Sequence, residues 1–164
     1  MQSPRHTLAF KVVVALGVVL WVGIVSVSAQ ATDARIGTWK LNVAKSKVSP
    51  GPPPQSLTVK VEPSGQGEKV ATEGVNADGT RTATQYTANF DGKDSPLTGS
   101  QIADTVSLKR IDARTTERTD KKAGTVAQTL RRVVSQDGKT MTVTVKGKNA
   151  QGQDVNSTLV FEKQ

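Results

Sequence analysis

One predicted strand, residues 125–135, carries the side chain with the sharpest chemical consequence. Successive residues of a strand point to opposite faces, so Gln128 and Arg132 turn inward together with the apolar residues of the same period, which are Val126, Leu130 and Val134. A buried arginine requires an anionic partner, because an uncompensated charge inside a protein is strongly destabilising. The carboxylate or phosphate of a ligand would supply that partner through a bidentate contact.

The same segment is compatible with a second arrangement. The opposite register, or a bulge, would turn Val133 inward and leave both Arg131 and Arg132 in solvent. In that arrangement Arg132 belongs to an ordinary charged surface and has no ligand to bind.

Aromatic side chains are the other candidates for ligand contact. Beyond residue 31 the chain has four of them: Trp39, Tyr86, Phe90 and Phe161. Tyr86 and Phe90 fall on the apolar face of one alternating run, and Phe161 falls on that of the last run. We therefore expect a small apolar or amphipathic ligand in a site lined by Tyr86, Phe90, Gln128, Arg132 and Phe161.

The composition excludes several kinds of chemistry. The only histidine is His6, near the N-terminus, and the chain has no cysteine. Without them, residues 32–164 cannot form a Ser-His-Asp or Cys-His site, or a zinc or copper site with imidazole or thiolate ligands. We expect no catalytic activity, no metal and no cofactor.

Basic residues gather between Lys109 and Arg132. Single-stranded nucleic acid would require exposed aromatic side chains beside this charge, and residues 104–135 contain none. We expect no nucleic-acid partner. Two interpretations remain: attraction to an anionic envelope surface, or a solvated face that keeps the protein soluble.

The elements that would position these residues are short strands. Apolar and polar residues alternate at period two, as half-buried antiparallel strands require, and Asp-Gly pairs supply tight turns between them. Nine strands are predicted, near residues 36–41, 56–63, 68–75, 81–90, 104–111, 114–120, 125–135, 139–147 and 154–163.

Hairpins in this succession favour an antiparallel up-and-down β-barrel of about eight or nine strands, which leaves no exposed edge. The proline-rich residues 42–55 are predicted to form a stiff, extended connection. Residues 91–104 are predicted to form a loop, either a binding loop at a barrel mouth or a surface linker. Many inward residues are small, which favours an interior cavity; a narrow barrel packed solid by Val, Leu and Met is the alternative.

Residues 1–31 have the pattern of a signal peptide. Arg5 and Lys11 precede an apolar core at 12–25, and Ala29-Gln30-Ala31 fits a cleavage site. An uncleaved membrane anchor is the alternative. Either way we expect a periplasmic or secreted domain at 32–164, with 20 basic and 14 acidic residues. We expect it to be a monomer.

Gly37-Thr38-Trp39-Lys40-Leu41 resembles the first strand of the calycin superfamily, and of fatty-acid-binding proteins especially. Val160-Phe161-Glu162-Lys163 is similar to that family's closing strand. The resemblance implies a lipocalin-like barrel in which Trp39 packs across one end as a structural residue.

The chain departs from that family at two places. The family's carboxylate-clamping Arg-x-Tyr is replaced by Leu159-Val160-Phe161, and residues 42–55 are too short and too rich in proline for the family's two-helix lid. Fatty-acid binding therefore does not carry over. The sequence predicts an exported, non-catalytic barrel for a small ligand, or alternatively an envelope-associated protein with a solid barrel and a basic binding surface.

Overall fold

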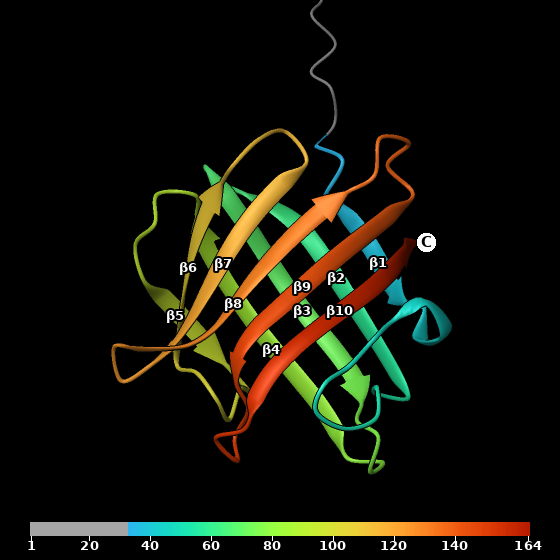
Figure 1. Cartoon of the computed structure of the whole chain (residues 1–164). Helices are drawn as coiled ribbons and strands as arrows, with labels where there is room; N and C mark the ends of the chain where they lie inside the picture. The colour runs from blue at the N-terminus through green and yellow to red at the C-terminus, as the bar shows by residue number, and fades with distance from the viewer. Residues whose placement is uncertain (1–32) are drawn as a thin grey trace, which may run out of the picture. The chain divides into compact units, whose positions relative to one another are not determined.

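Strand β1 (Gly37–Leu41) pairs with β2 on one side and with β10 on the other, which closes the sheet into a barrel (Figure 1). The structure is a computed structural model that describes residues 33–164, so the predicted signal peptide lies outside the described residues. All pairings between the strands are antiparallel and follow chain order. The remaining strands are β2 (Ser56–Ser64), β3 (Gly67–Val75), β4 (Arg81–Asn89), β5 (Ser95–Thr98), β6 (Thr105–Arg110), β7 (Thr115–Lys122), β8 (Thr125–Val134), β9 (Thr140–Lys148) and β10 (Asp154–Lys163).

The predicted all-β, up-and-down antiparallel barrel is confirmed by this topology, with ten strands instead of eight or nine. The additional strand is β5, in a segment that was predicted to be a loop. Leu97 is buried there, and its backbone N–H donates to the Asp104 carbonyl over 2.9 Å. Pro96 can belong to this paired strand because proline lacks only the backbone N–H donor and β5 is short, so the sheet loses one hydrogen bond at most.

The connection between β1 and β2 is not extended throughout, as the sequence suggested. It begins with a single 3-10 turn, η1 (Val43–Lys45), capped by the Asn42 side chain. It then runs beside β10, where the Asn156 N–H donates to the Ser49 carbonyl over 3.0 Å. Because β1 is short, part of β10 would otherwise present unpaired backbone groups, and this segment covers them.

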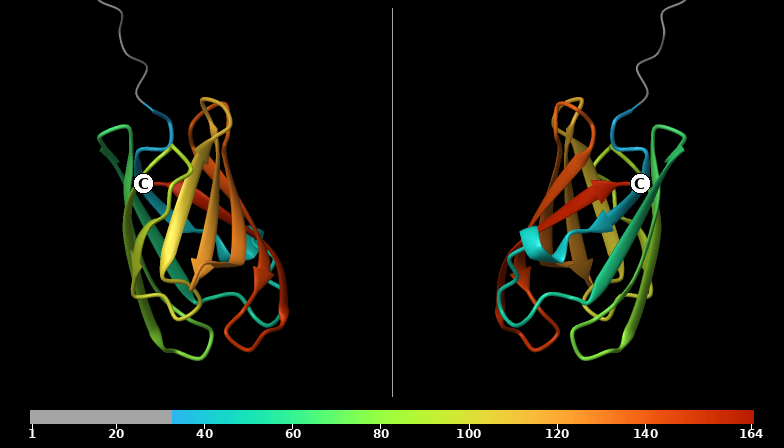
Figure 2. Two further views of the ribbon diagram at one scale, coloured as in Figure 1. Left: turned by 90° about the vertical axis from the view of Figure 1, so that its left-hand side faces the viewer. Right: turned by 90° about the vertical axis from the view of Figure 1, so that its right-hand side faces the viewer.

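The barrel has two ends, each with its own set of turns (Figure 1). The N-terminal end carries residues 33–36 and the β2–β3, β6–β7 and β8–β9 turns; the far end carries the β3–β4, β7–β8 and β9–β10 turns. Trp39 is fully buried at the N-terminal end, and its Nε1 donates to the Arg35 carbonyl over 2.9 Å. The C-terminus of β10 lies beside the segment that leads into β1 (Figure 2). Across residues 33–164 the structure contains no helix with the length and apolar character needed to span a membrane.

Candidate functional site

A cavity of about 170 Å³ lies inside the barrel. Its polar lining comes from two arginines, one tyrosine and two threonines, and no carboxylate lines it. The apolar lining residues are Leu57, Val59, Val70, Leu130, Met141, Val143, Leu159 and Phe161; the polar ones are Thr72, Thr84, Tyr86, Arg118 and Arg132. Of the two interiors that the sequence allowed, the barrel therefore has the one with a cavity.

Access to the cavity is from the far end of the barrel. Leu57, Thr72 and Thr84 lie near that end and are half-buried. Met141 and Phe161 lie deeper and are almost completely shielded from solvent. The cavity thus has a partly exposed rim and a buried, largely apolar floor.

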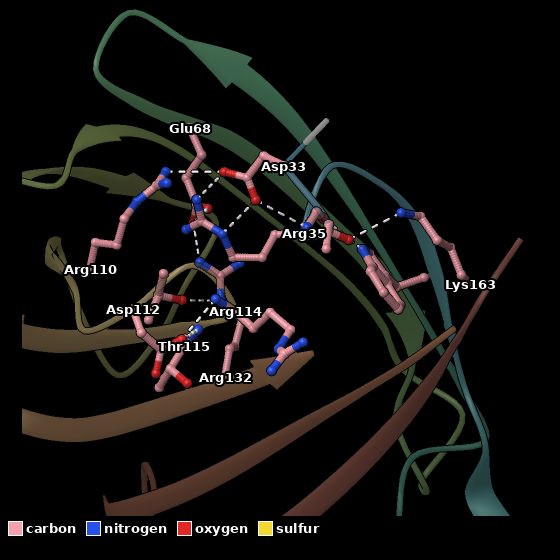
Figure 3. Close-up of polar contacts among 12 residues, drawn as sticks. Asp33, Arg35, Glu68, Arg110, Asp112, Arg114, Thr115, Arg132 and Lys163 are labelled. Atoms are coloured by element: carbon pink, nitrogen blue, oxygen red, sulfur yellow. Dashed lines mark hydrogen bonds and ion pairs between the residues drawn. The ribbon is translucent and has the colours of Figure 1, made fainter. Parts of the chain in front are cut away.

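Behind this floor Glu68 of β3 holds a network of buried polar groups (Figure 3). The Tyr86 hydroxyl donates to Glu68 Oε1 over 2.8 Å, and Arg132 Nη2 donates to the same oxygen. Arg35 Nη1 lies 3.8 Å from Glu68 Oε2. Glu68 and Arg35 are each only 1% exposed, so the barrel interior contains an ionised cluster and not apolar side chains alone.

Arg132 takes the inward of the two arrangements considered for its strand. Arg131 and Val133 on either side are exposed, while Arg132 is buried. Its Nε also donates to Thr116 Oγ1 over 3.2 Å. The anion that Arg132 requires is thus supplied by the protein's own Glu68. Val126, expected to face inward, is 55% exposed because the register of β7 and β8 shifts at Asp120/Lys121, which pairs Val126 with Lys121 on the outer face.

A second, partly buried ion pair lies on β7. Arg118 donates through Nε to Asp120 Oδ1 over 2.5 Å and through Nη2 to Oδ2 over 2.6 Å, a bidentate contact. The guanidinium of Arg118 also lies 4.9 Å from the centre of the Tyr86 ring. Arg118 and Arg132 therefore approach the cavity wall from neighbouring strands, on either side of Tyr86.

Burial and charge shift the pKa values of these groups. Burial is the main cause that raises the pKa of Tyr86 to about 12; Arg132 opposes the rise and Glu68 adds to it. For Arg118, burial alone would lower the pKa, but the contact with Asp120 and the neighbouring Tyr86 raise it overall. For Arg132, burial again lowers the pKa, and Tyr86 and Glu68 outweigh it. Both arginines are charged and Tyr86 is protonated at neutral pH.

Each of these arginines keeps one nitrogen unused. Within residues 33–164, the hydrogen bonds of Arg118 and Arg132 involve Nε and Nη2 only. Both residues line the cavity. An occupant that reached either Nη1 group would find a donor that no hydrogen bond among the described residues uses.

The five residues predicted to bind a ligand do not all meet. The cavity brings together Tyr86, Arg132 and Phe161. Phe90 lies at the N-terminal end, where its ring centre is 4.6 Å from the guanidinium carbons of both Arg35 and Arg110. Gln128 lies outside the cavity lining and donates through Nε2 to the Lys148 carbonyl over 2.9 Å.

Sequence reasoning missed Glu68, Arg35 and Arg118. The sequence could have located two of them by strand alternation. Glu68 lies two residues from Val70 on β3, and Arg118 lies two residues from Thr116 and Asp120 on β7, so both belong to the inward set. Arg35 precedes β1 and belongs to no strand, so no period could have located it.

The basic residues between Lys109 and Arg132 are largely engaged in ion pairs. The partly buried Arg118 pairs with Asp120 and the buried Arg132 with Glu68, as described above. Three exposed or half-buried residues pair with acids at the surface: Arg110 with Asp33, Lys121 with Asp94, and Arg131 with Glu117. Five of the eight basic residues from Lys109 to Arg132 are thus paired with an acid. Within residues 33–164, no group of His, Cys, Asp or Glu is arranged to hold a metal ion.

These features define a small antiparallel β-barrel with an amphipathic interior cavity. No protein-family model matches the chain, and no curated protein matches it. Among solved structures, the chain is similar to the ileal bile acid-binding protein of zebrafish, whose crystal structure is a complex with cholic acid. The TM-score is 0.47 and the identity 13%, over 80% of this chain and 99% of that one.

Proposed function

We propose that this protein is an exported, non-catalytic barrel that binds a small amphipathic ligand in its interior cavity. The apolar part of the ligand would contact Met141, Val143 and Phe161, and its anionic or acceptor group would face Arg118 and Arg132. The observation that carries this proposal is the lining itself, which combines an apolar floor with two guanidinium groups and no carboxylate.

The size of the cavity limits the ligand. Ordinary small-molecule pockets measure about 300–1,000 Å³, and a dry apolar cavity of about 150 Å³ accepts benzene. At about 170 Å³, the cavity encloses a compact molecule of similar size. A longer molecule would have to extend through the rim at the far end.

The charges favour an acceptor over a donor. Arg118 and Arg132 lie close enough for the positive charge of Arg118 to lower the pKa of Arg132, against the larger effects of Tyr86 and Glu68 that raise it. An anion between the two Nη1 groups would relieve this repulsion and gain charge-assisted hydrogen bonds. A cation in the same place would find no carboxylate to pair with.

No catalytic step is part of the proposal. Tyr86 is the titratable group in the cavity besides the arginines, and a pKa raised to about 12 makes it a poor base or nucleophile at neutral pH. The signal-peptide pattern of residues 1–31 supports a periplasmic or secreted location for a monomeric domain at 32–164.

Titration calorimetry with three ligands of one size tests the proposal. We expect benzoate to bind about tenfold or more tightly than benzyl alcohol, because hydrogen bonds to charged groups contribute about 1.5–3 kcal/mol, and benzylammonium not to bind. Replacing Arg118 with Gln should abolish the preference for benzoate. The matched control is Arg131→Gln, which removes an outward arginine and should change nothing. If none of the three compounds binds, the proposed function is wrong for ligands of this size.

A further inference from the structure

Residues 33–36, which precede β1, form a short strap across the N-terminal end of the barrel. Three contacts hold it: the Arg35 carbonyl accepts from Trp39 Nε1 over 2.9 Å, the Ala34 carbonyl accepts from Lys163 Nζ over 3.1 Å, and Asp33 accepts from Arg110 Nη2 over 3.0 Å. The strap thereby inserts the side chain of Arg35 into the barrel (Figure 3).

Arg35 is completely buried, although it follows directly on the N-terminal segment. Its guanidinium group donates through Nε and Nη2 to Asp33 and lies 4.6 Å from the centre of the Phe90 ring. Its remaining nitrogen, Nη1, faces Glu68 Oε2 at 3.8 Å, and neither atom has a hydrogen-bond partner among residues 33–164. Two buried charged atoms thus face each other without a hydrogen bond, which makes the attraction between them purely electrostatic.

Glu68 is therefore shared between two arginines that lie on opposite sides of it. Arg132, on the cavity side, bonds Oε1, and Arg35, on the strap side, attracts Oε2. If Arg35 were absent, Oε2 would be free to turn to Arg132. A carboxylate and a guanidinium group prefer two parallel hydrogen bonds, and the second bond would occupy Arg132 Nη1.

We propose that Arg35 is a positioning residue for the ligand site, which acts through Glu68 to keep Arg132 Nη1 available to an anionic ligand. This inference rests on the proposed function. Arg35 holds one oxygen of Glu68 away from the cavity, and it also adds one positive charge to the interior. With it, the buried Arg35 and Arg132 and the partly buried Arg118 face the two buried carboxylates of Glu68 and Asp120; without it, the charges of these groups balance. Asp33 offsets Arg35 only in part, because Asp33 is partly solvated and also pairs with Arg110.

The strap thus links the N-terminal end of the barrel to a cavity that is reached from the far end. A change that displaced the strap would weaken anion binding without touching any cavity-lining residue. The expected effect is on the preference for an anion, and not on the apolar contacts that a neutral ligand makes.

The test compares benzoate and benzyl alcohol binding to Arg35 variants by titration calorimetry. In Arg35→Met we expect benzoate affinity to fall about tenfold, the size of effect expected when one charge-assisted contact is lost, while benzyl alcohol affinity stays within about twofold. Arg35→Lys, which keeps the charge, should recover most of the benzoate affinity. Arg131→Gln, which removes an exposed arginine paired with Glu117 and makes no contact with the strap, is the matched control and should behave like the unmodified protein.

A double variant tests whether the effect passes through Glu68, and Arg35→Lys keeps the inference testable if Arg35→Met folds poorly. Arg35→Met with Glu68→Gln removes one charge of each sign and the carboxylate that would capture Arg132, so benzoate preference should return. An equal loss for both ligands in Arg35→Met, no loss for either, or a double variant without benzoate preference would each overturn the inference. Absence of binding by the unmodified protein would instead refute the proposed function.

Discussion

Arg132 of β8 and Glu68 of β3 form a buried ion pair across the interior of the barrel, although 64 residues separate them in the chain. Both side chains are almost completely shielded from solvent. The pair fixes one guanidinium group at the floor of the cavity and supplies the anion that the position of Arg132 demanded. The barrel interior therefore contains charged groups beside its apolar side chains. The two carboxylate oxygens of Glu68 face different arginines, so the charge near the cavity depends on both contacts.

Replacement of Glu68 with Gln should destabilise the fold severely. It leaves Arg132 and Arg35 buried without their shared anion, and breaking a buried pair costs about 3–5 kcal/mol. Urea unfolding followed by Trp39 fluorescence measures the loss. The matched control is Glu117→Gln, at an exposed pair with Arg131, where we expect a loss of about 0–1 kcal/mol. Equal losses in both variants would show that the buried pair contributes no more to the free energy of unfolding than an exposed pair does.

Tyr86 should make the fold sensitive to alkaline pH. Its pKa is raised by burial from 10.0 to about 12 in the folded protein, so the neutral phenol contributes stability that is complete below pH 10. This stability is lost as the pH rises towards 12, and two pH units correspond to about 3 kcal/mol.

The measurement is direct because Tyr86 is the only tyrosine in the chain. Ultraviolet absorbance should report no tyrosinate until well above pH 10, and then ionisation together with unfolding. In Tyr86→Phe the part of the alkaline destabilisation due to this group should disappear. Tyrosinate formation near pH 10 in protein that remains folded would contradict the buried position of the hydroxyl.

Gly99, in the turn after β5, should be irreplaceable for two reasons. Its φ of +78° disfavours other residues, and a Cβ there would collide with the Ala83 carbonyl. Gly79 is the matched control, because its φ is +85° but a Cβ would meet nothing within 4 Å. We expect Gly79→Ala to cost about 1–2 kcal/mol, the penalty for a left-handed backbone. Gly99→Ala should lower the stability measured by thermal unfolding clearly more than Gly79→Ala does. Equal losses would contradict the close approach of the turn after β5 to β4.

Much of the fold was predictable from the sequence because strand period and turn residues are local properties. The alternation of apolar and polar residues along β8 predicted that Arg132 lies on the inner face. The Asp-Gly pairs predicted where one strand ends and the next begins. The segment β5 was missed because its four residues are too few to establish a period, and its pairing depends on neighbours that close around it.

The candidate site was less predictable because its chemistry depends on pairings between distant strands. Alternation alone points Glu68 inward, but only the barrel closure shows that Glu68 faces Arg132 and not a ligand. Arg35 lies outside every strand, so its burial follows from the docking of the strap. Phe90 satisfied the inward period as well as Tyr86 did, yet it lies between two arginines at the other end of the barrel.

Met141 offers the most direct test of the proposal that the barrel interior binds a small anionic amphiphile. It is fully buried at the cavity floor, and it is the only methionine apart from Met1. In a nuclear magnetic resonance titration of protein labelled at the methionine methyl group, benzoate should shift the Met141 signal saturably, and benzylammonium at the same concentration should not. A Met141 signal that stays fixed while benzoate binds, or that responds equally to both compounds, would contradict an anion-selective site inside the barrel.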